Sequence, residues 1–252
     1  MLDIVNLVLI CVFAVVYLWA FYNVPILAAG VRDKRKTERL SYLQKKPVLT
    51  GEQPSFSILV PVKNEANLIG RLLDSLKKLN YAKDKVEIVI VEDGSTDNTL
   101  KICQNYAQNF GNIKVFARAR SDGKPSALNF GLHHCSGDVV AVFDADSVPE
   151  TDVLSNVAGY FAADASVAAV QGRTLSINSE QNMLTKFISY EEGVWCESYL
   201  RGKDALGLFV HLKGSCQFIR RKVLLALGGF NEQTLSEDME LSAHLVENGY
   251  KI

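Results

Sequence analysis

Two patterns of hydrophobic residues divide this sequence. Residues 4–29 are almost entirely apolar, and only Asn6, Asn23 and Pro25 interrupt the run. As a helix this run would be about 39 Å long, enough to cross a hydrocarbon core of about 30 Å. From Phe56 onward, short β-rich runs alternate with stretches of helical period. That alternation is typical of strand-helix units around a mostly parallel sheet.

Five runs are expected to form strands, and two stretches stand out as helices. The strand runs are residues 57–62, 87–93, 113–118, 138–146 and 166–172, and the helical stretches are residues 66–79 and 95–110. The second helix is expected to begin at the capping residues Ser95, Thr96 and Asp97, after a turn at Gly94. Strand ends therefore lead into helix N-termini at one edge of the sheet, where ligands bind in open α/β sheets.

The apolar run admits three interpretations: a membrane span, a signal peptide or a buried core helix. Small residues at 28–30 favour a signal peptide, but no basic side chain precedes the run, and it exceeds the usual h-region. Its length also disfavours a core helix. We therefore predict a transmembrane helix over residues 1–30, a basic juxtamembrane linker over residues 31–54 and a folded domain over residues 55–252.

Basic side chains directly after the run predict the orientation. They are Arg32, Lys34, Arg35, Lys36, Arg39, Lys45 and Lys46, against the acidic Asp33 and Glu38. By the positive-inside tendency, the N-terminus faces outward and the rest of the chain is cytoplasmic. The expected protein is thus a single-pass protein of the cell membrane.

Overall composition gives no support for a nucleic-acid partner or a structural zinc site. The 252 residues include 27 basic and 28 acidic side chains, so a net charge of −1 gives no argument for a nucleic-acid partner. The five cysteines show no CxxC pairing and no histidine at zinc-ligand spacing. This usage fits reduced thiols and argues against a structural zinc site.

Acidic residues follow three of the predicted strands. They are Glu65, the pair Glu92 and Asp93, and the pair Asp144 and Asp146. Two carboxylates separated by one residue at the end of a buried strand are costly unless neutralised, and a hard divalent cation that also contacts phosphate oxygens would neutralise them. The alternative is a capping turn before Pro149. Neither a GxxxxGK[ST] loop nor a GxGxxG after the first soluble strand is present, which disfavours P-loop and dinucleotide-binding enzymes.

Seven motifs in order make the pattern specific. They are PVKNE at 61–65, EDGSTD at 92–97, GKPSALN at 123–129, DAD at 144–146, QG at 171–172, GSCQFIRR at 214–221 and SED at 236–238. From about Phe56 to the C-terminus the sequence resembles the family 2 glycosyltransferases, particularly the membrane-attached group that includes cellulose, chitin and hyaluronan synthases and ceramide glucosyltransferase. The resemblance implies a GT-A fold: a Rossmann-like α/β domain with a mostly parallel sheet flanked by helices, here preceded by one transmembrane helix.

The resemblance also assigns donor-side roles. It places Pro61, Val62 and Glu65 beside the nucleoside, Glu92 and Asp93 at the base, Lys124 at the diphosphate, Asp144 at the ribose or metal and Asp146 as the direct metal ligand. The Asp93 carboxylate would accept the imide N–H of uracil, and Glu92 replaces an aspartate often found there. The implied metal is Mn²⁺ or Mg²⁺. Without the motif, Lys124 would be interpreted as a solvated lysine in a polar loop.

The resemblance also makes Asp238 the counterpart of the family's general base, the group that would deprotonate the acceptor hydroxyl. Ser236 is expected to cap its helix, whose apolar face is Met239, Leu241 and Leu245. The alternative role for Glu237 and Asp238 is complementing the helix dipole. Candidates on the acceptor side are Gln171, Gly214, Ser215 and Glu237.

The expected activity is metal-dependent, inverting transfer from a nucleotide-diphospho-sugar, with uridine as the expected nucleoside, to a glycan or lipid acceptor, with membrane lipid as a further partner. Relatives in this group continue with a Q/RxxRW motif and further transmembrane helices, whereas this sequence ends at Ile252, so a shortened form of the domain is expected. A non-catalytic sugar-nucleotide-binding module is the first alternative. A nucleotidyltransferase is the second, although residues 61–67 are not its Gly-rich basic loop. The aromatic-rich segment 181–215 is expected either to pack in the core or to form an amphipathic face against membrane or acceptor.

Overall fold

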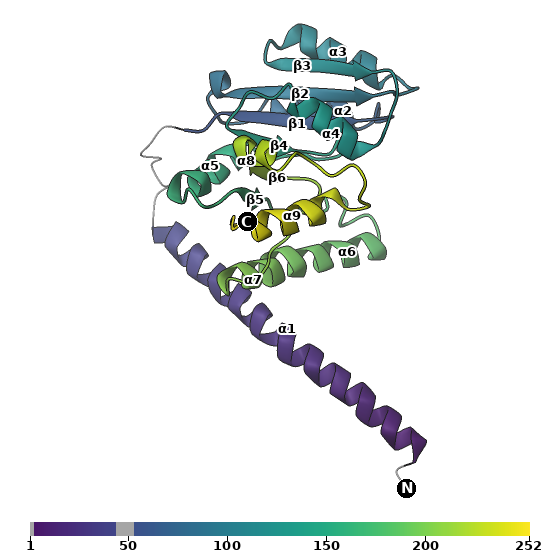
Figure 1. The fold of residues 1–252 in the computed structure, drawn as a ribbon, viewed down its shortest axis with the longest axis vertical. Helices are drawn as coiled ribbons and strands as arrows, with labels where there is room; N and C mark the ends of the chain where they lie inside the picture. Colours follow the sequence, from purple (N-terminus) through teal and green to yellow (C-terminus); the bar gives the residue numbers. More distant parts are fainter. Residues whose placement is uncertain (1–2, 44–52) are drawn as a thin grey trace. The chain divides into compact units, whose positions relative to one another are not determined.

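The computed structural model describes residues 3–43 and 53–252. It divides into two compact units, one made of Met1–Pro47 with Arg173–Val210 and the other of Val48–Gly172 with His211–Ile252. The second unit carries the sheet and the first is helical. Residues 173–210, which the sequence placed in the soluble domain, thus group with the N-terminal helix (Figure 1).

One six-stranded sheet forms the core of the second unit. Its strands are β1 (Phe56–Val62), β2 (Val86–Asp93), β3 (Ile113–Arg118), β4 (Val139–Val142), β5 (Ala169–Gln171) and β6 (Gln217–Arg220). Their order is β3-β2-β1-β4-β6-β5, with the first four parallel and β6 antiparallel to both of its neighbours. The expected mostly parallel sheet is confirmed, and β6 adds a strand that the hydrophobic pattern did not mark.

Helices cover both faces of this sheet (Figure 1). One face carries α2 (Ile69–Leu76), α3 (Thr99–Asn109) and α5 (Val153–Ala163), and the other carries α4 (Lys124–Leu132), α8 (Arg221–Ala226) and α9 (Glu237–Glu247). A short 3₁₀ turn, η1 (Lys83–Lys85), leads into β2. Because both faces are covered, the central strands are buried on both sides: Ile58 and Val60 join one cluster and Leu59 the other.

Strand direction explains which loops meet. Parallel strands β1, β2 and β4 all end at the carboxyl edge of the sheet. Because β6 runs the opposite way, the loop before it reaches that same edge, where Gln217 pairs with Val142. On its other side Gln217 pairs with Gln171, the last residue of β5. One edge therefore collects the loops after β1 to β5 and the loop before β6.

The starts of α3 and α4 and the cap of α9 differ from the expectation. Helix α3 begins at Thr99 rather than at Ser95, since the Asp97 side chain accepts hydrogen bonds from the Thr99 amide and hydroxyl and holds a turn there instead. Lys124 is the first residue of α4 rather than part of a loop. Ser236 precedes α9 without a side-chain capping bond, because its hydroxyl donates to the Asp238 carboxylate at 2.7 Å.

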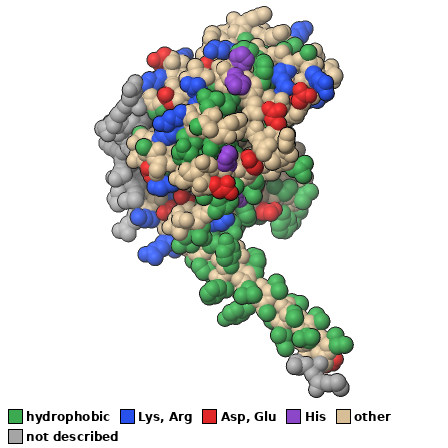
Figure 2. Space-filling view, in the orientation of Figure 1, with side chains coloured by type: hydrophobic (Ala, Val, Ile, Leu, Met, Phe, Trp, Pro, Cys, Tyr) green, Lys and Arg blue, Asp and Glu red, His purple; other side chains and the backbone are tan. Residues whose placement is uncertain are grey.

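The helical unit is built on α1 (Ile4–Leu43), which continues past residue 30 into the segment predicted as a linker. The part of that linker at 44–52 lies outside the described residues. Helix α6 (Met183–Val194) runs into a π-helical turn η2 (Trp195–Leu200) and then α7 (Arg201–Ala205). Within the described residues, α1 is the one helix long and apolar enough to cross a membrane, and Figure 2 shows hydrophobic side chains along its length.

Gly137 offers a test of how tightly the sheet is joined to its connections. A Cβ atom at this position would lie 2.6 Å from the Ser57 amide nitrogen and 2.7 Å from the Phe56 carbonyl carbon, both in the backbone of β1. Gly137→Ala should lower the free energy of unfolding by about 1–3 kcal/mol, the usual cost of overpacking. Denaturant titration of the detergent-solubilised chain would measure it. Gly111→Ala is the matched control, since nothing lies within 4 Å of its Cβ position; equal stability of the two variants would contradict the packing argument.

Candidate functional site

Lys124 is at the centre of the carboxyl edge. Its ammonium nitrogen lies 2.6 Å from Asp144 Oδ1, 3.2 Å from the Gly214 carbonyl oxygen and 3.9 Å from Glu237 Oε1. These partners come from the turn after β4, the loop before β6 and the start of α9. One cation thus joins three segments that are distant in the sequence. The Lys124 and Asp144 side chains remain about one-third exposed, so a ligand can reach both.

Asp238 lies beside the same turn. A Cβ atom on Gly214 would be 3.4 Å from Asp238 Oδ2 and 3.6 Å from Lys124 Nζ, so these charged groups flank the glycine. Asp238 Oδ1 accepts hydrogen bonds from the Ser236 hydroxyl and the Met239 amide, at 2.7 and 2.8 Å. Oδ1 is thus oriented by groups at the start of α9, while Oδ2 faces the Gly214 turn.

Ser215 connects the two loops directly. Its hydroxyl oxygen accepts a hydrogen bond from the Asp144 amide at 3.0 Å and lies 3.1 Å from Ser147 Oγ. The loop itself contains two left-handed residues, Gly214 at φ +52° and Cys216 at φ +52°. A non-glycine residue in that region is strained and needs support from its surroundings.

Gln171 supplies that support. Its Nε2 donates to the carbonyl oxygens of Gly172, Ser215 and Cys216 at 2.9, 3.1 and 3.3 Å, and its Oε1 accepts from the Lys213 amide at 2.7 Å. Both the nitrogen and the oxygen of the Gln171 side-chain amide are thus hydrogen-bonded to backbone groups. Gln171 was expected on the acceptor side; in the structure it holds the loop that carries Gly214 and Ser215.

The ends of β2 and β3 form the neighbouring part of the edge. Glu92 is 3% exposed and accepts a hydrogen bond from the Ser95 amide. Asp93 is 4% exposed, forms an ion pair with Arg118 at 3.1 Å and accepts a hydrogen bond from the Ser121 hydroxyl. Arg118 was missed by the sequence analysis, although it ends a predicted strand at the same edge as the acidic residues.

Hydrogen bonds join the loop after β1 to the loop after β2. The Asn64 side chain, on a residue at φ +55°, accepts from the Thr96 amide at 2.8 Å, and the Glu65 amide donates to the Thr99 hydroxyl at 2.8 Å. Hydrogen bonds from the Thr99 hydroxyl and amide hold the pKa of the Asp97 carboxyl below its usual range. Ahead of this loop, Pro61 is half-buried and Val62 is in the core at 2% exposure, so the Val62 side chain contributes to packing.

Asp146 is exposed, and its backbone carbonyl accepts a hydrogen bond from Arg71 at 3.0 Å. No cluster of three histidine, cysteine, aspartate or glutamate residues occurs among residues 3–43 and 53–252. Asp144 and Asp146 are the two carboxylates of the DAD motif, and Mg²⁺ typically takes one or two protein carboxylates together with substrate phosphates. The donor set fits a hard divalent cation of that kind.

The five cysteines, all in the described part of the chain, form no disulfide bond. Burial, with a smaller contribution from the Glu92 charge, raises the pKa of the Cys103 thiol to about 12. That thiol stays protonated at neutral pH.

Comparison with known proteins shows which family has this sequence and fold. The family model described as glycosyl transferase family 2 matches residues 57–228, which is more than half of the chain. The chain belongs to glycosyl transferase family 2. The resemblance seen in the sequence is thereby confirmed, and Asp238 lies beyond the matched range.

Relatives of this family 2 chain include curated proteins and solved structures. It is 36% identical over 201 residues to the beta-monoglucosyldiacylglycerol synthase of Nostoc sp., covering 78% of this chain and 42% of that protein. It is 30% identical over 242 residues to the probable glycosyltransferase YdaM of Bacillus subtilis, covering 95% of this chain and 57% of that protein. The chain thus spans about half the length of these curated relatives.

Among solved structures, the mannosyltransferase PcManGT from Pyrobaculum calidifontis, in complex with GDP-Man and Mn²⁺, superposes with a TM-score of 0.67 and 25% identity, covering 94% of this chain and 64% of that one. Staphylococcus aureus TarS, residues 1–349, superposes with a TM-score of 0.55 and 23% identity, covering 76% of this chain and 55% of that one. The latter likeness supports the fold alone. The expected GT-A fold is confirmed.

The loop-holding role of Gln171 can be measured without an activity assay. Gln171→Leu removes the acceptor of the Lys213 amide and a donor to three carbonyl groups, of which that of Cys216 keeps a bond from the Gly172 amide at 2.7 Å. Leaving a polar group without its hydrogen bond costs roughly 1–3 kcal/mol when the group is buried. Hydrogen exchange at Lys213 should accelerate about tenfold or more, because 1.4 kcal/mol corresponds to a factor of ten. Gln104→Leu, an exposed glutamine on α3, is the control. Unchanged exchange at Lys213 in the Gln171 variant would show that the loop needs no such support.

Proposed function

We propose that this chain is an inverting, metal-dependent glycosyltransferase that moves a sugar from a nucleotide-diphospho-sugar to an acceptor hydroxyl at the cytoplasmic face of a membrane. The observation that carries the proposal is the convergence of Lys124, Asp144 and Asp238 around the Gly214 turn. A cation, a carboxylate suited to a metal and a carboxylate oriented by its helix are the groups that a glycosyl transfer needs.

In the proposed reaction, Asp238 accepts the proton of the acceptor hydroxyl while the acceptor oxygen forms a bond to the anomeric carbon. The bond between that carbon and the diphosphate oxygen breaks, and the nucleoside diphosphate leaves with the electron pair. Attack and departure on opposite sides of the carbon invert its configuration. Asp144 and Asp146 would hold the divalent cation, which when bound neutralises charge on the diphosphate.

Lys124 is proposed to contact the departing diphosphate. Its ammonium now pairs with Asp144 at 2.6 Å, and both side chains are partly exposed, so the pair is held by a modest free energy. A diphosphate can therefore become a new partner of Lys124 at little cost. The Gly214 carbonyl keeps the lysine aimed at this edge in the meantime.

Donor and acceptor classes are inferred by analogy. We propose a UDP-sugar donor, with Asp93 and its partner Arg118 near the base, and a lipid or glycan acceptor. The name of the Nostoc relative, a glucosyldiacylglycerol synthase, favours a lipid acceptor, and the GDP-Man complex of PcManGT makes a GDP-sugar the alternative donor.

Membrane location is supported by α1, with its apolar stretch and the basic residues that follow it. We propose that α1 crosses the membrane once, with the domain over residues 55–252 on the cytoplasmic side. A non-catalytic sugar-nucleotide-binding module is the second candidate function, and the turnover assay described next distinguishes it from the enzyme.

Asp238→Asn should abolish transfer while leaving donor binding intact, because the amide keeps the shape of the carboxylate and accepts no proton. The expected loss is about 10²–10⁴-fold in rate. Release of nucleoside diphosphate and product formation would be measured on the full chain in membranes, with diacylglycerol as acceptor, UDP- and GDP-sugars as donors, and Mn²⁺, Mg²⁺ or EDTA. The control is Glu247→Gln, an exposed acid at the far end of α9. Transfer at the wild-type rate in Asp238→Asn would exclude this base, and binding without turnover in the wild type would favour the non-catalytic module.

Lys124→Met should weaken donor binding rather than chemistry alone. A hydrogen bond to a charged group is worth roughly 1.5–3 kcal/mol, so the dissociation constant for the donor should rise about 10–100-fold. Isothermal titration calorimetry with the nucleotide sugar and the metal would measure it, with Lys222→Met, an exposed lysine on α8, as control. A dissociation constant equal to that of the control variant would remove Lys124 from the donor site.

A further inference from the structure

Helix α6 exposes its apolar side. Six large apolar side chains on its twelve residues are 41–71% exposed: Met183, Leu184, Phe187, Ile188, Tyr190 and Val194. At 100° per residue these positions fall on one continuous side of the helix, and Glu191 is the one charged residue within it. No residue of α6 is buried.

The polar side of α6 is the less exposed side. Thr185, Lys186, Ser189 and Glu192 are only partly exposed, and the Glu192 carboxylate accepts a hydrogen bond from the Ser176 hydroxyl at 2.5 Å. A surface helix of a protein in water has the reverse arrangement, with apolar residues inward and polar residues outward. The medium outside α6 is therefore expected to be apolar.

The connection to α1 indicates which apolar medium this is. Helix α6 continues without a break into η2 and α7, and both of these pack on α1. The packing is backbone against backbone: a Cβ atom at Gly30 would lie 1.8 Å from the Ser198 carbonyl oxygen, and one at Gly202 would lie 1.9 Å from the Ile26 carbonyl oxygen. Two ion pairs secure this crossing, Lys34 with Glu197 and Arg201 with Asp33.

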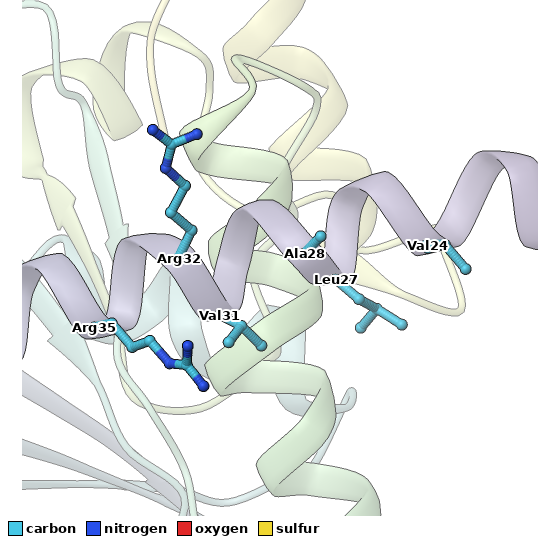
Figure 3. Close-up of a pocket in the computed structure, with 6 residues that line it drawn as sticks. All are labelled: Val24, Leu27, Ala28, Val31, Arg32 and Arg35. Atoms are coloured by element: carbon cyan, nitrogen blue, oxygen red, sulfur yellow. The ribbon is translucent and has the colours of Figure 1, made fainter.

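This crossing lies where α1 changes from apolar to basic. Figure 3 shows Val24, Leu27 and Val31 along α1, followed by Arg32 and Arg35. Such a step from apolar to basic residues marks the headgroup level of a membrane-spanning helix. The start of η2, and with it the end of α6, is thus tied to α1 at the level of the membrane surface.

We propose that α6 is an interfacial helix, whose apolar face lies among the lipid headgroups and upper acyl chains beside α1. The proposal rests on the proposed membrane span of α1. Interfacial helices of this kind bury their apolar face about 5–10 Å below the surface, and residues such as Tyr190 with an apolar ring and a polar tip suit that depth. Lipid is favoured over a soluble partner protein because α6 joins a helix whose own apolar residues, Ile4 to Val24, are already exposed.

Depth-dependent quenching of tryptophan fluorescence would test this placement. The two natural tryptophans, Trp19 and Trp195, would be replaced by phenylalanine in the full chain. A single reporter would then be introduced by Phe187→Trp, with Leu235→Trp as the matched control, since Leu235 is fully exposed in the other unit. Both variants would be reconstituted in liposomes of phosphatidylcholine and phosphatidylglycerol, with and without brominated acyl chains.

The Phe187→Trp reporter should show blue-shifted emission and at least twofold stronger quenching by brominated lipid than the Leu235→Trp control. Equal quenching of the two reporters in protein that floats with the liposomes would overturn the α6 proposal while leaving the span of α1 intact. Failure of the protein to float, or its extraction by carbonate, would overturn both. Quenching that appears only with proteins of the native membrane added, and not with lipid, would indicate a protein partner and would also overturn the lipid assignment.

Discussion

The arrangement of the carboxyl edge depends on one compensated charge. Asp144 follows a strand buried on both faces, and its partly exposed carboxylate is balanced by a counter-charge from a neighbouring helix. Lys124 supplies that charge from the first turn of α4 and reaches the Gly214 carbonyl at the same time. The ion pair therefore sets the spacing between the loop after β4 and the loop before β6. Both side chains of this pair are partly exposed, so a ligand can reach them.

Strand β6 makes that spacing possible. Had it been parallel to β4, the loop before it would reach the opposite edge, and Gly214 and Ser215 would lie far from Asp144. The antiparallel direction requires a tight turn, and the left-handed conformations of Gly214 and Cys216 are its cost. Gln171 offsets the strain by binding the backbone of the loop on both sides. These contacts of Gln171 with the loop depend on β5 and β6 being neighbours.

The helical unit exposes its apolar side chains, unlike the unit that contains the sheet. In the sheet-containing unit, apolar side chains are inward and charges gather at one edge, as expected in water. Along α1 and on the outer side of α6 the apolar side chains are outward, and the polar groups of α6 are the shielded ones. Within this unit, close backbone contacts at Gly30 and Gly202 hold α1 against η2 and α7.

The local sequence pattern alone determined the order of the main elements and the position of the acidic residues at strand ends. The change from a long apolar run to alternating strands and helices follows from periodicity, and the carboxylates at strand ends follow from the order of motifs, because both are properties of neighbouring residues. The pairing of Asp93 with Arg118, the loop-holding contacts of Gln171, the start of α4 at Lys124 and the reversed faces of α6 depended on the tertiary structure. Each is a contact or an exposure set by segments far apart in the chain, and no spacing within a single segment carries that information.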